Sequence, residues 1–203
     1  ESAVTGTIQR GFKFKGRIND KPYFLTVLST TTAVKLADNT YKFYKVPVYQ
    51  GTIKTTNFRI DGLDPFGKYE IPSDSVDTDQ LYVTVSDADN TDIRVPYTYF
   101  ENIRRATPTS EVYFMNENPF GKFEIYFGDD YLGKKPDSGS KVVMEYLETD
   151  GKEANNIKTF VASDTIEGFS DIVVTISDGY TKSFGGREKE SAESVRFNAP
   201  ISY

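Results

Sequence analysis

The sequence contains no cysteine, no histidine and no tryptophan, and each absence removes a class of function. Without cysteine the chain has no disulfide, thiolate nucleophile, zinc ribbon or iron–sulfur cluster. Without histidine it lacks the usual general base near neutral pH and the commonest transition-metal ligand. The missing tryptophan removes the largest aromatic platform for a sugar, although 14 tyrosines and 15 phenylalanines remain. Catalytic and metal-dependent roles therefore lack most of their usual residues.

Long apolar runs and an excess of positive charge are also missing. No segment approaches the roughly 20 apolar residues that a transmembrane helix needs. Residues 1–6 lack the basic-then-apolar layout of a secretion signal. The 24 basic residues are outnumbered by 30 acidic ones, which gives a net charge of −6. We therefore expect a protein that binds neither nucleic acid nor an anionic membrane.

Residues that favour β-strands are abundant. Valine, isoleucine, threonine, tyrosine and phenylalanine total 79, whereas alanine, leucine and methionine total 18. This excess predicts a mainly β fold. Regular turns between short strands favour antiparallel sandwich or barrel-like sheets over βαβ units. Period-two or apolar runs predict strands at residues 23–28, 41–46, 81–85, 112–114, 123–127, 142–147 and 172–176.

The length of 203 residues suits one large domain or two small ones. We expect a β-rich domain over residues 1–182, within which two subdomains would break near 101–110. The period-two pattern stops at the C-terminus, where Glu188 and Glu190 suit the positive end of a helix. Residues 183–203 are therefore expected to be the truncated start of a helical segment, a short C-terminal helix that is marginal alone.

Two short echoes occur in the sequence. Residues 65–71 recur as residues 119–125, and residues 83–87 recur as residues 174–178. Because the two offsets differ, the echoes argue against a tandem repeat array. They predict one turn-into-strand solution used more than once.

An acidic segment offers a candidate ion site. Asp87, Asp89 and Asp92 resemble the start of an oxygen-rich calcium loop. An EF-hand loop would place glycine at the position of Asp92 and glutamate six residues later, where a threonine stands. We favour a hairpin loop, and the sequence leaves open whether the three aspartates bind an ion. Asp129 and Asp130 form a weaker case, because neighbouring side chains of a strand point to opposite faces.

Other candidate sites are weaker still. Gly185-Gly186-Arg187 lacks the lysine and Ser/Thr of a phosphate loop. Thirty carboxylates make a pair at glycosidase spacing uninformative. The aromatic residues at 97–100 and 41–49 could face a glycan or peptide, but core or cross-strand positions are commoner. Arg104-Arg105 is expected at a solvated edge or a subunit contact. We predict no enzyme and no catalytic, cofactor-binding or metal-binding residues.

A longer pattern is more specific. It comprises Val112-Tyr113-Phe114, then residues 123–146 with Gly128-Asp129-Asp130 and Gly133-Lys134-Lys135-Pro136, then Thr149-Asp150-Gly151, Ala154-Asn155-Asn156, Phe160 and residues 185–200. In order and spacing these segments resemble the baseplate-J-like wedge proteins of contractile phage tails, and most of all the large ring-forming wedge subunit of T-even-type phages. The resemblance covers residues 69–203 well and residues 1–68 poorly. Relative to that family, the sequence ends before an arginine-containing continuation.

The resemblance implies a structural subunit of the virion's tail baseplate, assembled in the cytoplasm of a bacterial host. Such a subunit forms part of the wedge ring through contacts with neighbouring wedge proteins and with copies of itself, as a homo-oligomer that would be a dimer at full length. The alternative is a carbohydrate- or receptor-binding β module of a phage tail or cell surface.

The resemblance also assigns turn positions. Gly128, Gly133 and Gly139 are expected to hold two hairpin turns, with no chemistry implied. We expect valine at residue 128 or 139 to cost more than about 1 kcal/mol, because β-branched residues resist positive φ. Asp130, Ala154 and Asn156 replace glycines of the family pattern. Aspartate and asparagine can still reach turn geometry there, and alanine less easily.

Overall fold

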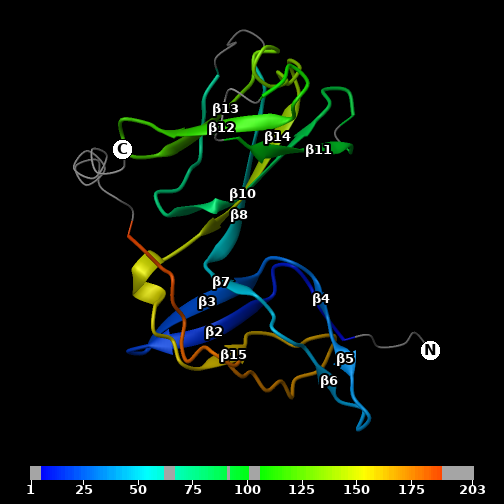
Figure 1. The fold of residues 1–203 in the computed structure, drawn as a ribbon, viewed down its shortest axis with the longest axis vertical. Helices are drawn as coiled ribbons and strands as arrows, with labels where there is room; N and C mark the ends of the chain where they lie inside the picture. The colour runs from blue at the N-terminus through cyan, green and yellow to red at the C-terminus, as the bar shows by residue number, and fades with distance from the viewer. Residues whose placement is uncertain (1–5, 62–66, 91, 101–105, 189–203) are drawn as a thin grey trace. The chain divides into compact units, whose positions relative to one another are not determined.

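The computed structural model describes residues 6–61, 67–90, 92–100 and 106–188 (Figure 1). Strands account for 44% of the structure and helix for 2%, and the sheets are mostly antiparallel, which confirms the mainly β prediction. Within these ranges the helical structure is one 3-10 turn, η2 (Gly151–Ala154). The described residues contain no helix long and apolar enough to cross a membrane.

The chain forms two compact units and passes between them twice. The first unit comprises residues 1–52 and 149–203, and the second comprises residues 53–148. The second unit is therefore inserted in sequence between β7 (Val48–Gln50) and η2 of the first. The break considered near residues 101–110 falls inside the second unit, partly on residues 101–105, which the structure does not describe.

The first unit is built on a four-stranded antiparallel sheet in the order β15-β2-β3-β7. The central pair is a hairpin whose turn residues Asn19 and Asp20 have φ values of 46° and 65°. Two consecutive left-handed residues match the twist of a two-residue hairpin, and Asn and Asp adopt them readily. The strands of this unit are β1 (Thr7–Ile8), β2 (Lys13–Ile18), β3 (Lys21–Val27), β4 (Thr31–Thr32), β5 (Val34–Lys35), β6 (Tyr41–Lys42), β7 and β15 (Phe160–Ala162).

Two apolar clusters stabilise the first unit. One contains Phe14, Val27 and Ile166, with Ile172 and Val174 packed against it. The other contains Tyr23, Leu25, Ala154 and Ile157. Gly16 of β2 makes room for the second cluster, because a Cβ atom there would lie 2.2 Å from Cγ2 of Ile157.

The second unit is a seven-stranded sheet in the order β8-β14-β10-β11-β12-β13-β9. The longest strand, β10, pairs antiparallel with both β11 and β14, and its register with β14 shifts between Asp77 and Leu81. The pairing of β11 with β12 is parallel, which departs from the expected all-antiparallel arrangement. The strands are β8 (Thr52–Arg59), β9 (Tyr69–Glu70), β10 (Val76–Ser86), β11 (Arg94–Tyr99), β12 (Val112–Glu117), β13 (Phe123–Phe127) and β14 (Lys141–Glu148).

The core of the second unit combines strand residues with Ile60 and Ile71, which directly follow β8 and β9. Ile71, Ile125 and Val142 are completely buried there. Aromatic rings close the edge of this core, where Phe58 and Tyr69 stack with centroids 3.8 Å apart. Such stacking stabilises a fold by about 0.5–1.5 kcal/mol beyond what the burial of the two rings contributes.

The first sequence echo has a structural explanation. The two copies pair with each other antiparallel through β9 and β13, where Glu70 lies opposite Glu124 and Tyr69 opposite Ile125. The antiparallel register makes their ion pairs reciprocal: Lys68 contacts Glu124 at 2.7 Å, and Lys122 contacts Glu70 at 3.1 Å. The repeated Lys-aromatic-Glu pattern therefore complements itself across the strands.

Two predicted strands and the start of the predicted helix need correction. The predicted strand at residues 41–46 stops after Lys42, because the backbone at Lys45 is left-handed, with φ 51°. Phe43 and Val46 pack on the same apolar cluster although they are three residues apart, which the period of two of a strand does not allow. Residues 172–176 alternate as a strand does but lie in no sheet. Residues 183–188 of the predicted helical segment are non-helical, and the helix expected to start near Arg187 otherwise falls on residues 189–203, which the structure does not describe.

Candidate functional site

The loop after β13 contains Asp129 and Asp130, which belong to the pattern that carried the resemblance. The Asp129 carboxylate accepts hydrogen bonds from the backbone N–H groups of Tyr131 and Leu132, both at 3.0 Å. These two bonds lower the pKa of Asp129, since they favour its charged form. The Asp130 carboxylate accepts a third bond, from the N–H of Lys135 at 2.9 Å. The two aspartates therefore fix the loop rather than converge on an ion.

Glycine at position 128 is required by close packing. A Cβ atom on Gly128 would lie 2.1 Å from the carbonyl oxygen of Gly133. Its φ is not in the left-handed region, so the positive-φ reason expected from sequence is wrong for this residue. Gly133 and Gly139 do have positive φ, 92° and 86°, but the expected hairpin turns are wrong, because β13 and β14 do not pair with each other. Asp130 replaces a family glycine at φ 68°, which confirms the expected turn geometry.

A second pair of motifs meets in the first unit. The Asn155 side chain donates from Nδ2 to the carbonyl of Gly186 at 2.8 Å and accepts from its N–H at 2.9 Å. Asn156 adopts φ 77°, as the replacement of a glycine predicted. Ala154 needs no such geometry, because it is the buried last residue of η2. Within this unit, the two hydrogen bonds to Gly186 thus hold the segment Gly185-Gly186-Arg187 against Asn155.

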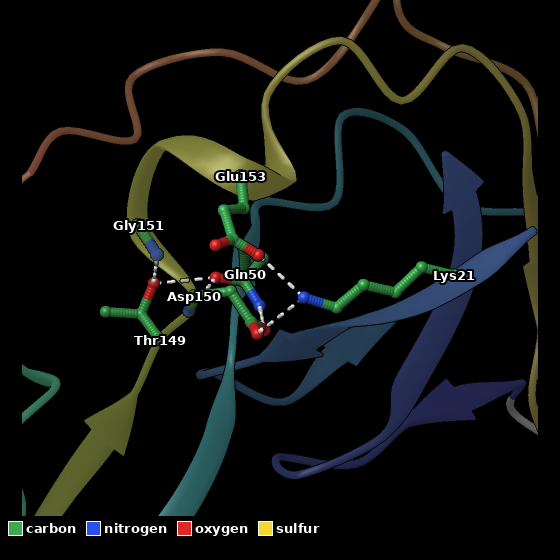
Figure 2. A network of polar contacts seen from close by, with 6 residues as sticks. All are labelled: Lys21, Gln50, Thr149, Asp150, Gly151 and Glu153. Carbon is green, nitrogen blue, oxygen red and sulfur yellow. Dashed lines mark hydrogen bonds and ion pairs between the residues drawn. The ribbon is translucent and has the colours of Figure 1, made fainter. Parts of the chain in front are cut away.

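A polar network secures the point where the chain returns to the first unit (Figure 2). The Oε1 atom of Gln50 accepts from the Thr149 hydroxyl at 2.6 Å and from the Asp150 N–H at 2.8 Å. Its Nε2 donates to the Asp150 carboxylate at 2.7 Å. Lys21 then bonds Glu153 at 2.6 Å, which raises the lysine pKa to about 12. This network holds β7 beside the segment that follows β14.

Sequence reasoning missed this network. The two partners Gln50 and Asp150 are 100 residues apart, and Gln50 belongs to no motif that the sequence singled out. The Thr149-Asp150-Gly151 tripeptide was the one available signal, as part of the resemblance.

The candidate calcium loop does not gather its carboxylates. Asp87 accepts from the N–H of Asp89 at 3.1 Å, whereas Asp92 donates its own N–H to the Asn90 side chain at 3.1 Å. These are local turns of the kind that Asp and Asn make with the backbone two residues on. Throughout the described ranges, no group of three or more acidic side chains is placed to hold a metal ion.

The aromatic candidates divide between core and surface. Tyr97 is buried and meets Phe127 edge to face at 5.4 Å, whereas Tyr99 is exposed. In the 41–49 segment, Tyr44 and Tyr49 are exposed. The pair Arg104-Arg105 falls on residues that the structure does not describe. The aromatic residues therefore form no single ligand-binding face in the two segments that the sequence singled out.

The motif residues form hydrogen-bonded turns within each unit, and the second unit also contains the reciprocal ion pairs between β9 and β13. No protein-family model matches the chain. It is similar to "Baseplate wedge protein gp6" of Enterobacteria phage T4, with 27% identity over 212 residues. The match covers 94% of this chain and 31% of that protein, so the chain spans about a third of its relative's length.

This similarity supports a family of phage baseplate proteins without singling out one member. It also corrects the expected extent of the resemblance. A match to 94% of the chain includes most of residues 1–68, where the sequence pattern had indicated little likeness.

Proposed function

We propose that this chain is a structural domain of a contractile phage tail baseplate, where it forms part of the wedge ring through protein–protein contacts. It acts in the virion, after assembly in the host cytoplasm, and it catalyses no reaction. Its partners are neighbouring wedge proteins and, in the complete protein, a second copy of itself. The similarity to a baseplate wedge protein over most of the chain is the observation that supports this role most directly.

The roles of the motif residues agree with this proposal. Gly128, Asp129 and Asn155, which carried the resemblance, all shape backbone turns or join segments by hydrogen bonds. Residues kept for rigidity suit a subunit that must present its surfaces in fixed geometry, because preorganised surfaces lose less entropy on association.

A deletion in the phage that encodes this chain tests the proposal. Removing residues 53–148 from the complete protein should leave particles without complete baseplates in negative-stain micrographs, and plasmid-borne wild-type protein should restore them. The matched control is the same plasmid with Tyr131→Ala. Complete, contractile tails that form without the second unit would contradict a structural role for it.

The alternative, a carbohydrate- or receptor-binding module, is favoured by one observation. Tyr131 is 81% exposed at the tip of a loop that Asp129 holds rigid, and tyrosine is a common anchor in binding sites. A glycan array decides between the two functions. Binding to a defined host sugar that disappears with Tyr131→Ala would support the alternative, and no binding above background would leave the structural proposal standing.

A further inference from the structure

Residues 172–176 of the first unit have the sequence of a strand but no strand partner. Their sequence, Ile-Val-Val-Thr-Ile, consists entirely of β-branched residues, which favour extended structure. Ile172 and Val174 pack against the apolar cluster that includes Phe14, whereas Val173 is 90% exposed and Thr175 is exposed as well. This alternation is that of a strand with one face on the core.

The backbone of this segment has unused hydrogen-bonding capacity. In the part of the chain that the structure describes, the N–H and C=O groups of residues 173–176 bond to no other group. The segment is nevertheless anchored: Ile172 and Val174 pack on the core, turns at Ser170 and Ser177 flank it, and Ser183 bonds to Ile157 further along the chain. The segment is therefore held in place with its pairing edge open.

Natural proteins protect such an edge, and this segment has none of the usual protection. Edge strands commonly carry lysine, proline or a bulge that prevents pairing with another chain. Residues 172–176 contain no charge, no proline and no glycine. The nearest charged residues, Asp171 and Asp178, flank the segment. Both are exposed and form no ion pair with any described residue.

We propose that residues 172–176 accept an added β-strand from a neighbouring protein chain, and that this strand carries a basic residue at each end. The added strand supplies the missing backbone hydrogen bonds, as in other cases of β-strand addition. Asp171 directly precedes the segment and Asp178 lies in the turn that follows it, so the two carboxylates flank a stretch that a strand of about eight residues spans. Lysine or arginine at that spacing on the partner meets both carboxylates, whichever direction the strand runs.

The strand-addition proposal rests on the proposed function only for the identity of the neighbouring chain, which would be another subunit of the baseplate.

Amide hydrogen exchange of the complete protein, alone and within purified baseplates, tests the strand-addition proposal directly. The amides of residues 173–176 should exchange quickly in the free protein, and those facing the added strand should be at least about 100-fold slower in the baseplate. Fast exchange in both states, or protection already present in the free protein, would overturn the proposal.

A matched pair of variants separates backbone pairing from side-chain contact. Val173→Pro removes one N–H, and Val173→Thr keeps it, while the 90% exposure of this side chain leaves the core intact in both. The N–H groups of residues 173 and 175 face the same edge of a strand, so Thr175→Pro and the double variant remove further donors from that edge, and the exchange measurement shows which edge is paired. Val173→Thr should enter baseplates normally, and the double proline variant should enter at least tenfold less. If the proline variants fail to fold, the exchange measurement on wild-type protein decides.

A peptide tests the chemistry of the partner independently of any baseplate. The probe has eight residues, with lysine at both ends and alternating valine and threonine between them, and the control has glutamate at both ends. Chemical shift changes at residues 172–176 of the complete protein should show the lysine peptide binding about tenfold more tightly at low salt. Equal affinities, or changes elsewhere only, would overturn the proposal. Absence of the wild-type protein from baseplates would instead refute the proposed function and leave this peptide result valid.

Discussion

Replacing Gly128 by alanine should destabilise the second unit strongly, for a steric reason. The new Cβ would lie 2.1 Å from the Gly133 carbonyl oxygen and 2.2 Å from its carbon. Real Cβ atoms do not approach backbone this closely, so the loop at Gly133 must move. That loop is held by three backbone hydrogen bonds: Asp130 to Gly133, Gly133 to Thr107 and Lys134 to Ser110, at 3.0, 3.0 and 2.8 Å.

The size of the effect follows from these bonds. A net contribution of about 1 kcal/mol for each gives a loss of about 3 kcal/mol if all three break. For a chain of this length, 1 kcal/mol corresponds to about 2–4 °C in Tm, so the melting temperature should fall by about 6–12 °C. Thermal unfolding followed by circular dichroism measures the change.

Gly179→Ala is the matched control. Gly179 has φ 92° but no neighbouring atom within 4 Å of a new Cβ, so the substitution introduces backbone strain without a clash. The cost should be about 1–2 kcal/mol, which is smaller than at Gly128. A Gly128→Ala melting temperature within about 1 °C of wild type, or a larger loss at Gly179, would refute the packing argument.

Three further predictions concern charge and protonation. Gln50→Glu places a second carboxylate against Asp150 and should destabilise by about 1–3 kcal/mol at pH 7 and less at pH 4, measured by urea unfolding. Burial raises the pKa of Tyr113 to about 12, so its contribution to stability is complete below pH 10 and lost as pH rises toward 12; in urea unfolding, Tyr113→Phe should lose less stability than wild type between pH 10 and pH 12. Hydrogen bonds from Lys68 and then Asn116 lower the pKa of Glu124. The ionised carboxylate therefore stabilises the fold above about pH 4.5, and this stabilisation is lost on acidification. Glu124→Gln should make the free energy of unfolding less dependent on pH in the acidic range.

Local patterns in the sequence predicted β3, β12, β13 and β14, the short β6 and part of β10, but not the other strands of the described residues. The strand at 123–127 was predicted with its observed bounds, because alternating residues and a preceding turn are sufficient local signals. The prediction for residues 41–46 failed because the backbone is left-handed at Lys45. Lysine rarely adopts this conformation, so the sequence gives no sign of it. The strand-like residues 172–176 show that alternation predicts extended backbone but not the presence of a partner.

Long-range contacts were beyond sequence reasoning. Asn155 meets Gly186 across 31 residues, and Gln50 meets Asp150 across 100, with no periodicity that relates the partners. The parallel pairing of Thr98 and Tyr99 with β12 was equally hidden, because pairing direction depends on the path of the intervening chain. The echo at Lys68 and Lys122 was visible, but its meaning as two strands that pair with each other needed the register.

The most direct test of the structural role is a cryo-electron microscopy map of the tail baseplate from the phage that encodes this chain. If the chain has this role, the four-stranded and seven-stranded sheets should both fit density in the wedge ring, with each copy contacting its neighbours. Baseplate density that is fully explained by other proteins, together with the absence of this chain from purified particles by mass spectrometry, would contradict it.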